Sequence, residues 1–378
     1  MIPSGPSNPN QTSHTGLQAG ALALLVRGAL LIAIFCIWGR SWYDYLSSSD
    51  AGSFLPVARV IAGLEHADQL KLYDTRVFLG WPLIIAPFLA LGLPQQSALV
   101  LVLLGAALAP WLYARLTNDF TSAWLLAVFP PAWLLATIHP ISEAVYLVLI
   151  VAGCLAVQRH RWFLTGLAAG SLVLVRPFGI AWVIAFALPL LRTQKSRSNA
   201  AAYIFGGLLM AAVLVWANLS LYHDLLHQFY VYARPLSQLN LPAASSHGEL
   251  PAGHWGWPFV SLVSTPFHYQ VPPWKILYID ALAAVSLLLI GKAGCQLRDP
   301  DLPGWQQAAL AGFIGNTVLS FCTGPYWGFH SFDRYLIWGL PGALVAAQPW
   351  LQRWRWLPWI LAASSIAMTA FAVWIRFR

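Results

Sequence analysis

Long apolar runs recur along this chain, and they are the feature that most limits how it can fold. Crossing a hydrocarbon core of about 30 Å takes roughly 20 helical residues. Only 9% of the residues are charged and 58% are hydrophobic, which leaves too little charge to cover a soluble domain. We therefore expect an all-α, polytopic transmembrane helix bundle. The apolar runs are 20–39, 97–114, 121–138, 141–157, 201–219, 275–291, 305–322, 335–349 and 356–375.

Two further apolar stretches do not have the length of one span. Residues 162–191 are too long, and Arg176-Pro177 interrupts them. Because helices usually end before a proline, we predict two short helices that meet at Arg176. The run 81–93 is too short and contains or adjoins Pro82, Pro87 and Pro94, so we predict a re-entrant or interfacial helix. The count is about eleven crossings, give or take one.

The basic residues predict an orientation. They stand singly or in small groups at the ends of apolar runs, as the positive-inside rule expects, so the net charge of +8 does not indicate nucleic-acid binding. Placing these groups in the cytoplasm also places the N-terminus there. The non-cytoplasmic segments are then 40–80, 139–143, 220–272 and 323–334. The groups are Arg159/Arg161, Arg192/Lys195/Arg197, Lys292/Arg298 and Arg353/Arg355.

The N-terminus, the cysteines and the glycine motifs give no sign of a signal peptide, a metal site or a nucleotide site. Residues 1–18 are polar and lack a basic n-region, so we expect a disordered N-terminus without a cleaved signal, followed by one membrane domain over 19–378 with short interfacial helices in its first outer loop. The four cysteines are far apart and have no histidine at ligand spacing. No Walker A or GxGxxG motif is present. We predict neither a metal nor a soluble cofactor.

Acidic residues crowd into the first outer segment. Asp50 lies between Ser47-Ser48-Ser49 and Ala51-Gly52, where small neighbours let a substrate approach, and a carboxylate there could act as a general base. The alternative is that Asp50 caps a helix over 51–63. The same two interpretations apply to the turn His139 to Glu143: Glu143 serves a site, or Ser142 caps a helix with Glu143 in its first turn.

Two arginines stand at outer span ends, where the positive-inside rule gives no reason for a cation. A guanidinium is well suited to bind a phosphate bidentately. Arg334 has a neighbouring acid, Asp333, as an alternative partner, whereas Arg176 has no sequence-adjacent acid and is the stronger phosphate candidate. In the long outer loop, Trp255 and Trp257 either stack on a sugar or belong to the interfacial aromatic belt.

The order of these features resembles the C-type (GT-C) glycosyltransferases, and most of all the glycosylphosphatidylinositol mannosyltransferases and their bacterial relatives. The resemblance covers roughly residues 20–350, and it rests on the order of short motifs. These are an acid in the first outer loop (Asp50), an aromatic entry into a Pro-broken helix (Tyr73 to Pro87), Pro140-x-Ser142-Glu143, Arg176-Pro177-x-Gly179 and Asp333-Arg334-Tyr335.

The resemblance implies inverting transfer of a hexose, mannose in that family branch, from a polyprenyl-phosphate-sugar to a hydroxyl acceptor on a lipid, glycan or protein. Asp50 would be the base. Because Ser49 stands where the eukaryotic pattern has a tryptophan, Asp44 is a rival. Arg176 and Arg334 would bind the donor phosphate. The residues implied to position substrate are Glu143, His139, Asp74, Trp255 and Trp257.

Other functional classes remain open. A lipid or glycan transporter would need buried charges in several spans and an internal repeat, whereas these spans are nearly free of charge and no repeat is visible in the sequence. An oligosaccharide ligase would need several arginines in the long outer loop, which holds only Arg234. The short loops favour a bacterial inner membrane with the site facing the periplasm, with the endoplasmic reticulum as the eukaryotic alternative.

Overall fold

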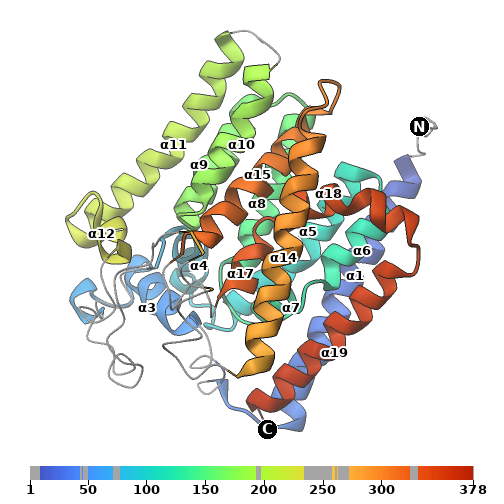
Figure 1. Ribbon diagram of the computed structural model, residues 1–378. Coiled ribbons are helices and arrows are strands. Elements are labelled where there is room, and N and C mark those ends of the chain that lie inside the picture. Colours follow the sequence, from blue (N-terminus) through green and yellow to red (C-terminus); the bar gives the residue numbers. More distant parts are fainter. Residues whose placement is uncertain are drawn as a thin grey trace.

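The computed structural model describes residues 9–42, 45, 50–70, 77–192, 197–233, 258–259, 262, 272–323 and 331–377. Throughout this described part the chain forms helices and no β-strand (Figure 1). Helix α5 (Ser97–Thr117) packs between α1 (Pro9–Ile32) and α8 (Glu143–Gln158). A second group packs beside it, formed by α9 (Trp162–Val175), α10 (Gly179–Arg192), α11 (Arg197–Tyr222) and α15 (Gly304–Phe321).

Short helices surround these long ones. A π-helical turn (Ala33–Ile37) ends α1, and the first outer segment contains α3 (Ala51–Ile61), a 3₁₀ turn (Ala67–Gln69) and α4 (Gly80–Ala90). The short helices expected in this segment are therefore present. The remaining elements are α6 (Phe120–Val128), α7 (Pro131–Thr137), α12 (His227–Ala233), α14 (Pro273–Gln296), α17 (Phe332–Ile337), α18 (Leu340–Arg353) and α19 (Leu357–Phe377).

Among the described residues, five helices are long and apolar enough to cross a membrane, and α6 with α7 makes a sixth if the bent pair is one span. The five are Gly16–Ile37, Ser97–Thr117, Arg197–Tyr222, Pro273–Gln296 and Leu357–Phe377. The protein is therefore an all-α membrane protein. Several shorter apolar helices, including α8, α9 and α10, accompany the long ones, and the total of about eleven crossings stays a prediction.

Three sequence-based boundaries are corrected. The run 121–138 is bent by 60° between α6 and α7, because Pro130 and Pro131 interrupt the helical hydrogen bonding. The run 335–349 is divided at Trp338-Gly339 into α17 and α18, with Pro341 in the first turn of α18. Residues 9–18, expected to be disordered, belong to α1, which packs along α5 up to Trp111 beside Gly16.

Other expectations are confirmed. The stretch 162–191 does form two helices, α9 and α10, that meet at Arg176, and the run from Trp81 forms the short helix α4. Gly179 permits the tight break, because a Cβ there would lie 2.3 Å from the backbone carbon of Leu172. The break therefore returns α10 directly alongside α9.

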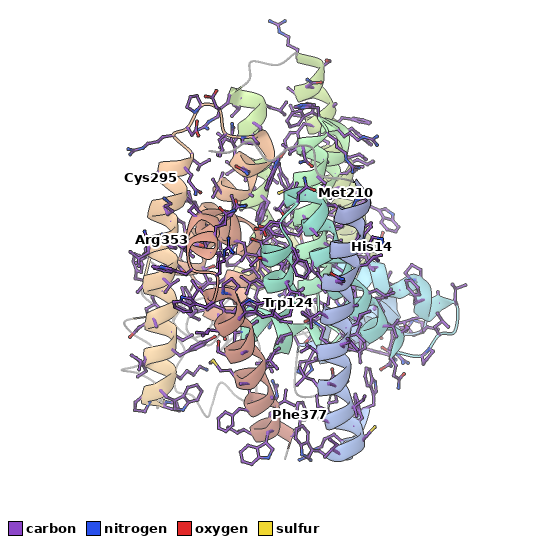
Figure 2. The ribbon with its side chains drawn as sticks, turned by 90° about the vertical axis from the view of Figure 1, so that its right-hand side faces the viewer. His14, Trp124, Met210, Cys295, Arg353 and Phe377 are labelled. Carbon is purple, nitrogen blue, oxygen red and sulfur yellow. The ribbon has the colours of Figure 1, made fainter. Side chains whose placement is uncertain are left out.

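The two ends of the helix bundle contain different connecting segments. In Figure 1 the turns α8–α9 and α14–α15 lie at the top, and α3, α12 and the α9–α10 break lie lower. Figure 2 likewise shows Cys295, near the end of α14, and Phe377, at the end of α19, at opposite ends of the molecule. The basic turns α8–α9 and α14–α15 are thus separated from α3 along the helices.

A buried arginine braces the bent pair from within the bundle. Arg27 of α1 is completely buried and lies over the ring of Trp133 at 5.2 Å. It donates from Nη1 to the carbonyl oxygen of Ala127 at 2.9 Å and from Nε to Oγ1 of Thr137 at 2.6 Å. Since these acceptors stand in α6 and at the end of α7, one guanidinium spans the break that precedes the turn to Glu143.

Candidate active site

Two carboxylates and two guanidinium groups from four separate segments meet at the lower end of the bundle. Arg334 donates from Nη1 to Oδ2 of Asp50 at 2.6 Å and from Nε to Oε1 of Glu143 at 2.5 Å. Arg176 donates from Nη2 to the same Oε1 of Glu143 at 3.0 Å. We call these four residues the carboxylate–arginine cluster. It brings together every catalytic and phosphate-binding candidate of the sequence that the structure describes.

Glu143 is the inner anchor of this cluster. Its side chain is completely buried, and it begins α8 directly after the turn at Pro140. Oε1 accepts from both arginines, while Oε2 has no hydrogen-bond partner among the described residues. A buried carboxylate is stable only if cations or donors compensate its charge. Glu143 therefore holds both guanidinium groups in place from the buried side of the cluster.

Arg176 occupies the break between α9 and α10 in an extended conformation. Its guanidinium carbon lies 5.5 Å from the ring of Phe54 and 5.4 Å from that of Trp338, and Nε donates to Oγ of Ser142 at 2.9 Å. Ser142 stands at the N-cap of α8 and Glu143 in its first turn, as the capping alternative expects, but the side chain of Ser142 accepts from Arg176 and makes no capping hydrogen bond. Arg176 has an acid partner after all, one that the sequence places 33 residues away.

Arg334 stands in the first turn of α17 and links the carboxylates of Asp50 and Glu143. Its sequence neighbour Asp333 accepts the backbone N–H of Arg334 at 2.8 Å, whereas the guanidinium forms its ion pairs with Asp50 and Glu143. Burial alone would lower the pKa of Arg334, but the two carboxylates outweigh it and raise that pKa above its ordinary value. Arg334 therefore stays charged. Its Nη2 has no hydrogen-bond partner among the described residues.

Asp50 is the exposed member of the cluster. It occupies the N-cap position of α3, yet its side chain makes no capping hydrogen bond, so the capping alternative is wrong for the carboxylate. Exposure of the side chains falls from 32% for Asp50 to 21% for Arg334 and 0% for Glu143. The site thus has an accessible carboxylate at its mouth and a buried one at its base, with Arg334 between them.

His139 lies beside the cluster in an aromatic pocket. Its ring stacks on Tyr45 with centroids 4.8 Å apart, and Phe377 lies at 6.4 Å. Burial lowers the pKa of His139 to about 3, with Arg376 and Arg334 lowering it further and Asp50 acting in the opposite direction. Neither ring nitrogen has a hydrogen-bond partner among the described residues. His139 is therefore neutral at physiological pH and packs behind the site.

Several groups near the cluster were missed by the sequence analysis. Phe54 and Trp338 flank Arg176, and no local pattern marks them. Arg376 interacts electrostatically with Asp50, and Arg40 donates from Nε to the carbonyl oxygen of Phe377 at 2.7 Å. A signal for Arg376 did exist, because a chain with eleven crossings and a cytoplasmic N-terminus would place this cation on the outer side, as it would place Arg176.

Four candidates cannot be placed. Asp44, Asp74, Trp255 and Trp257 lie outside the described residues. Within the described ranges, no group of three or more His, Cys, Asp or Glu side chains could hold a metal ion. Comparisons with protein-family models, with curated proteins and with solved structures return no match to this chain.

The cluster has a defined chemical capacity. The accessible carboxylate of Asp50 can take a proton from a hydroxyl that enters from the outside. Next to it, guanidinium groups with remaining donors can bind an anionic leaving group. Glu143 keeps two arginines at one place although their mutual repulsion would separate them. A carboxylate base beside guanidinium groups can serve a reaction in which an activated hydroxyl displaces an anionic leaving group.

Proposed function

We propose that this protein is a membrane glycosyltransferase of the GT-C type that moves a hexose, mannose, from a polyprenyl-phosphate-sugar to a hydroxyl acceptor, with inversion at the anomeric carbon. The observation that carries the proposal is the ion pair between the partly exposed Asp50 and Arg334, anchored by the buried Glu143. It supports a base and a phosphate-binding cation at adjacent positions. The acceptor is a lipid, a glycan or a protein.

In the proposed reaction, Asp50 accepts the proton of the acceptor hydroxyl as that oxygen attacks the anomeric carbon of the donor. The bond between this carbon and the phosphate oxygen breaks, and polyprenyl phosphate leaves with the electron pair. Arg334 and Arg176 stabilise the phosphate, and Glu143 holds both guanidinium groups in place. The ion pair with Arg334 orients the carboxylate of Asp50 before the acceptor enters.

The proposed topology determines which side of the membrane the cluster faces. The cluster would face the non-cytoplasmic side of a bacterial inner membrane, where the isoprenoid tail of the donor stays in the bilayer and only phosphate and sugar enter the protein. The apolar exteriors of α11 and α14 support such a lipid-side entrance, since these helices expose large hydrophobic side chains such as Phe205 and Leu288. No soluble cofactor takes part in this scheme.

The test is sugar transfer by the purified full chain in detergent. The donor is radiolabelled polyprenyl-phosphate-mannose, and the acceptors come from a lipid extract of the source. Asp50→Asn should reduce transfer about 10²–10⁴-fold, the usual contribution of a general base, while the purified variant stays folded. Glu65→Gln is the matched control, because Glu65 pairs with Arg59 at the surface of the same segment.

Three results would decide between the alternatives. Loss with Asp44→Asn but not with Asp50→Asn would move the base to Asp44. Loss of donor affinity with Arg176→Ala would assign phosphate binding. If the wild-type protein consumes no polyprenyl-phosphate sugar with any acceptor extract, the transferase proposal is wrong.

A further inference from the structure

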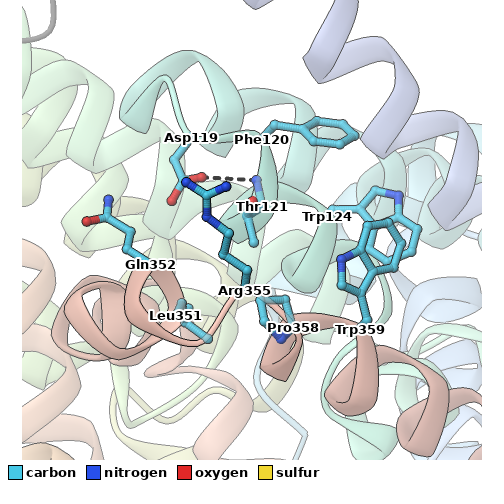
Figure 3. A pocket seen from close by; sticks show the side chains of 9 residues that line it. All are labelled: Asp119, Phe120, Thr121, Trp124, Leu351, Gln352, Arg355, Pro358 and Trp359. Atoms are coloured by element: carbon cyan, nitrogen blue, oxygen red, sulfur yellow. Dashed lines mark hydrogen bonds between the residues drawn. The ribbon is translucent and has the colours of Figure 1, made fainter.

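A cavity of about 520 Å³ opens far from the carboxylate–arginine cluster, between the start of α6 and the turn that joins α18 to α19. Figure 3 shows Asp119 and Gln352 on one side of it and Trp124 and Trp359 on the other, with Arg355 between them. The cavity belongs to the end of the bundle that carries Arg353 and Arg355, which the charge pattern places at the cytoplasmic interface. Nothing in the proposed sugar transfer uses it.

One charge of each sign faces this cavity. Asp119 caps α6: Oδ1 accepts the backbone N–H groups of Thr121 at 3.0 Å and Ser122 at 3.4 Å, and Oδ2 accepts the hydroxyl of Ser122 at 2.6 Å. Arg355 extends across the cavity towards Asp119 (Figure 3). Within the described part of the chain, neither side chain forms an ion pair within 4.0 Å. Both groups can therefore receive a ligand.

The opposite wall is aromatic and reaches the outside of the bundle. Trp124 and Trp359 meet edge to face with centroids 4.6 Å apart, and Trp359 remains 60% exposed. Trp354 and Trp356, beside Arg355, are 45% and 58% exposed. Tryptophan collects where lipid headgroups meet hydrocarbon, because one part of the ring is apolar and its N–H can be hydrated. This wall therefore marks the level of the headgroups.

We propose that this cavity binds the headgroup of an aminophospholipid, with the phosphate on Arg355, the primary ammonium on Asp119 and the glycerol backbone along the edge of Trp359. A zwitterion with its two charges a few bonds apart matches the paired charges of the cavity. A purely anionic headgroup would meet repulsion from Asp119. A trimethylated ammonium cannot donate a hydrogen bond to that carboxylate. The primary amine satisfies both groups.

The test is native mass spectrometry of the full chain after delipidation in detergent. Equimolar phosphatidylethanolamine, phosphatidylglycerol and phosphatidylcholine with identical acyl chains are added together. The wild-type protein should retain phosphatidylethanolamine about tenfold over the other two, which corresponds to about 1.4 kcal/mol. Arg355→Gln should weaken retention of all three lipids, and Asp119→Asn should remove only the preference for the primary amine.

Matched controls keep the result interpretable. Arg353→Gln removes an exposed cation two positions from Arg355 that does not line the cavity, so its lipid retention should equal that of the wild type. Asp119→Ser keeps a favoured N-cap residue while it removes the charge, and it should behave as Asp119→Asn does. Agreement between these two variants separates loss of the carboxylate from damage to α6.

Three outcomes would overturn the proposal. One is equal retention of the three lipids by the wild-type protein. Another is an equal loss with Arg353→Gln and Arg355→Gln, which would reduce the effect to general surface charge. The third comes from water-soluble glycerophosphoethanolamine: if it displaces the lipid at equal concentration, the ligand is a free headgroup compound and not a membrane lipid.

Discussion

Arg334 and Asp50 are 284 positions apart in the sequence and 2.6 Å apart in the structure. Their contact joins α17, near the end of the chain, to the first residue before α3. Arg334 is itself held by Glu143, so the orientation of the exposed carboxylate depends on a residue that no substrate can reach. Each of the following predictions tests one part of this arrangement.

Glu143→Gln should destabilise the protein strongly. The substitution leaves two guanidinium groups without their shared counter-ion, and breaking a buried ion pair in this way costs about 3–5 kcal/mol. Glu65→Gln breaks the more exposed pair with Arg59 and should cost about 0–1 kcal/mol. Thermal unfolding in the same detergent compares the two. Equal decreases in unfolding temperature for the two variants would show that Glu143 stabilises the protein no more than Glu65 does.

Arg334→Lys should reduce sugar transfer although it keeps the positive charge. A lysine ammonium is a compact point charge, whereas the guanidinium fork of Arg334 reaches Asp50 and Glu143 at once. A double-mutant cycle with Asp50→Asn and Arg334→Gln should give a coupling of about 0.5–3 kcal/mol in unfolding free energy. Additive effects would mean that the contact contributes nothing to stability.

The decrease in the free energy of unfolding at acidic pH should depend on His139. Its folded pKa of about 3 lies below the unfolded value of 6.5, so the unfolded state binds more protons between these values. Stability is therefore fully present above about pH 6.5 and is lost as the pH falls towards 3, by at most about 1.4 kcal/mol per pH unit. His139→Gln should flatten this slope, while His66→Gln, at an exposed position, should leave it unchanged. Unfolding at pH 4 to 8 measures both.

Arg27→Met should destabilise the bent α6–α7 pair. The carbonyl of Ala127 and the hydroxyl of Thr137 would lose their donor, and an unsatisfied buried group costs about 1–3 kcal/mol. Because α7 leads into the turn before Glu143, sugar transfer should fall as well. Arg115→Gln, at an exposed position over Trp111, is the control. Unchanged unfolding of Arg27→Met would contradict a bracing role.

Labelling of single cysteines tests the orientation. In a variant without the four native cysteines, Asp68→Cys should react with a membrane-impermeant maleimide added outside intact cells. Arg298→Cys should react only after the membrane is opened. Both positions are exposed, so a failure to react reports the membrane and not burial. The reverse pattern would place the carboxylate–arginine cluster in the cytoplasm and exclude a donor that is presented outside.

The sequence predicted the helical class and the break at Arg176, because apolar length and Pro177 are local signals. The division at Trp338-Gly339 was missed, although Pro341 lacks the N–H with which a continuous helix would bond the carbonyl oxygen of Ile337. The pairing of Arg334 with Asp50 and Glu143 could not be predicted either. A sequence shows which residues stand at the ends of the membrane spans, but it does not show which of these span ends lie next to one another in the fold. The same limit applies to Phe54 and Trp338, whose rings flank Arg176 only through packing.

The spacing of the cluster along the chain has a consequence for biogenesis. Glu143 and Arg176 lie 33 residues apart, within one helical hairpin, so the acid can find a cation as soon as that hairpin has left the ribosome. Arg334 follows 191 residues after Glu143. Arg334, which pairs with Asp50, is therefore synthesised only after most of the polypeptide has been made. The carboxylate–arginine cluster would therefore stay incomplete until synthesis is nearly finished.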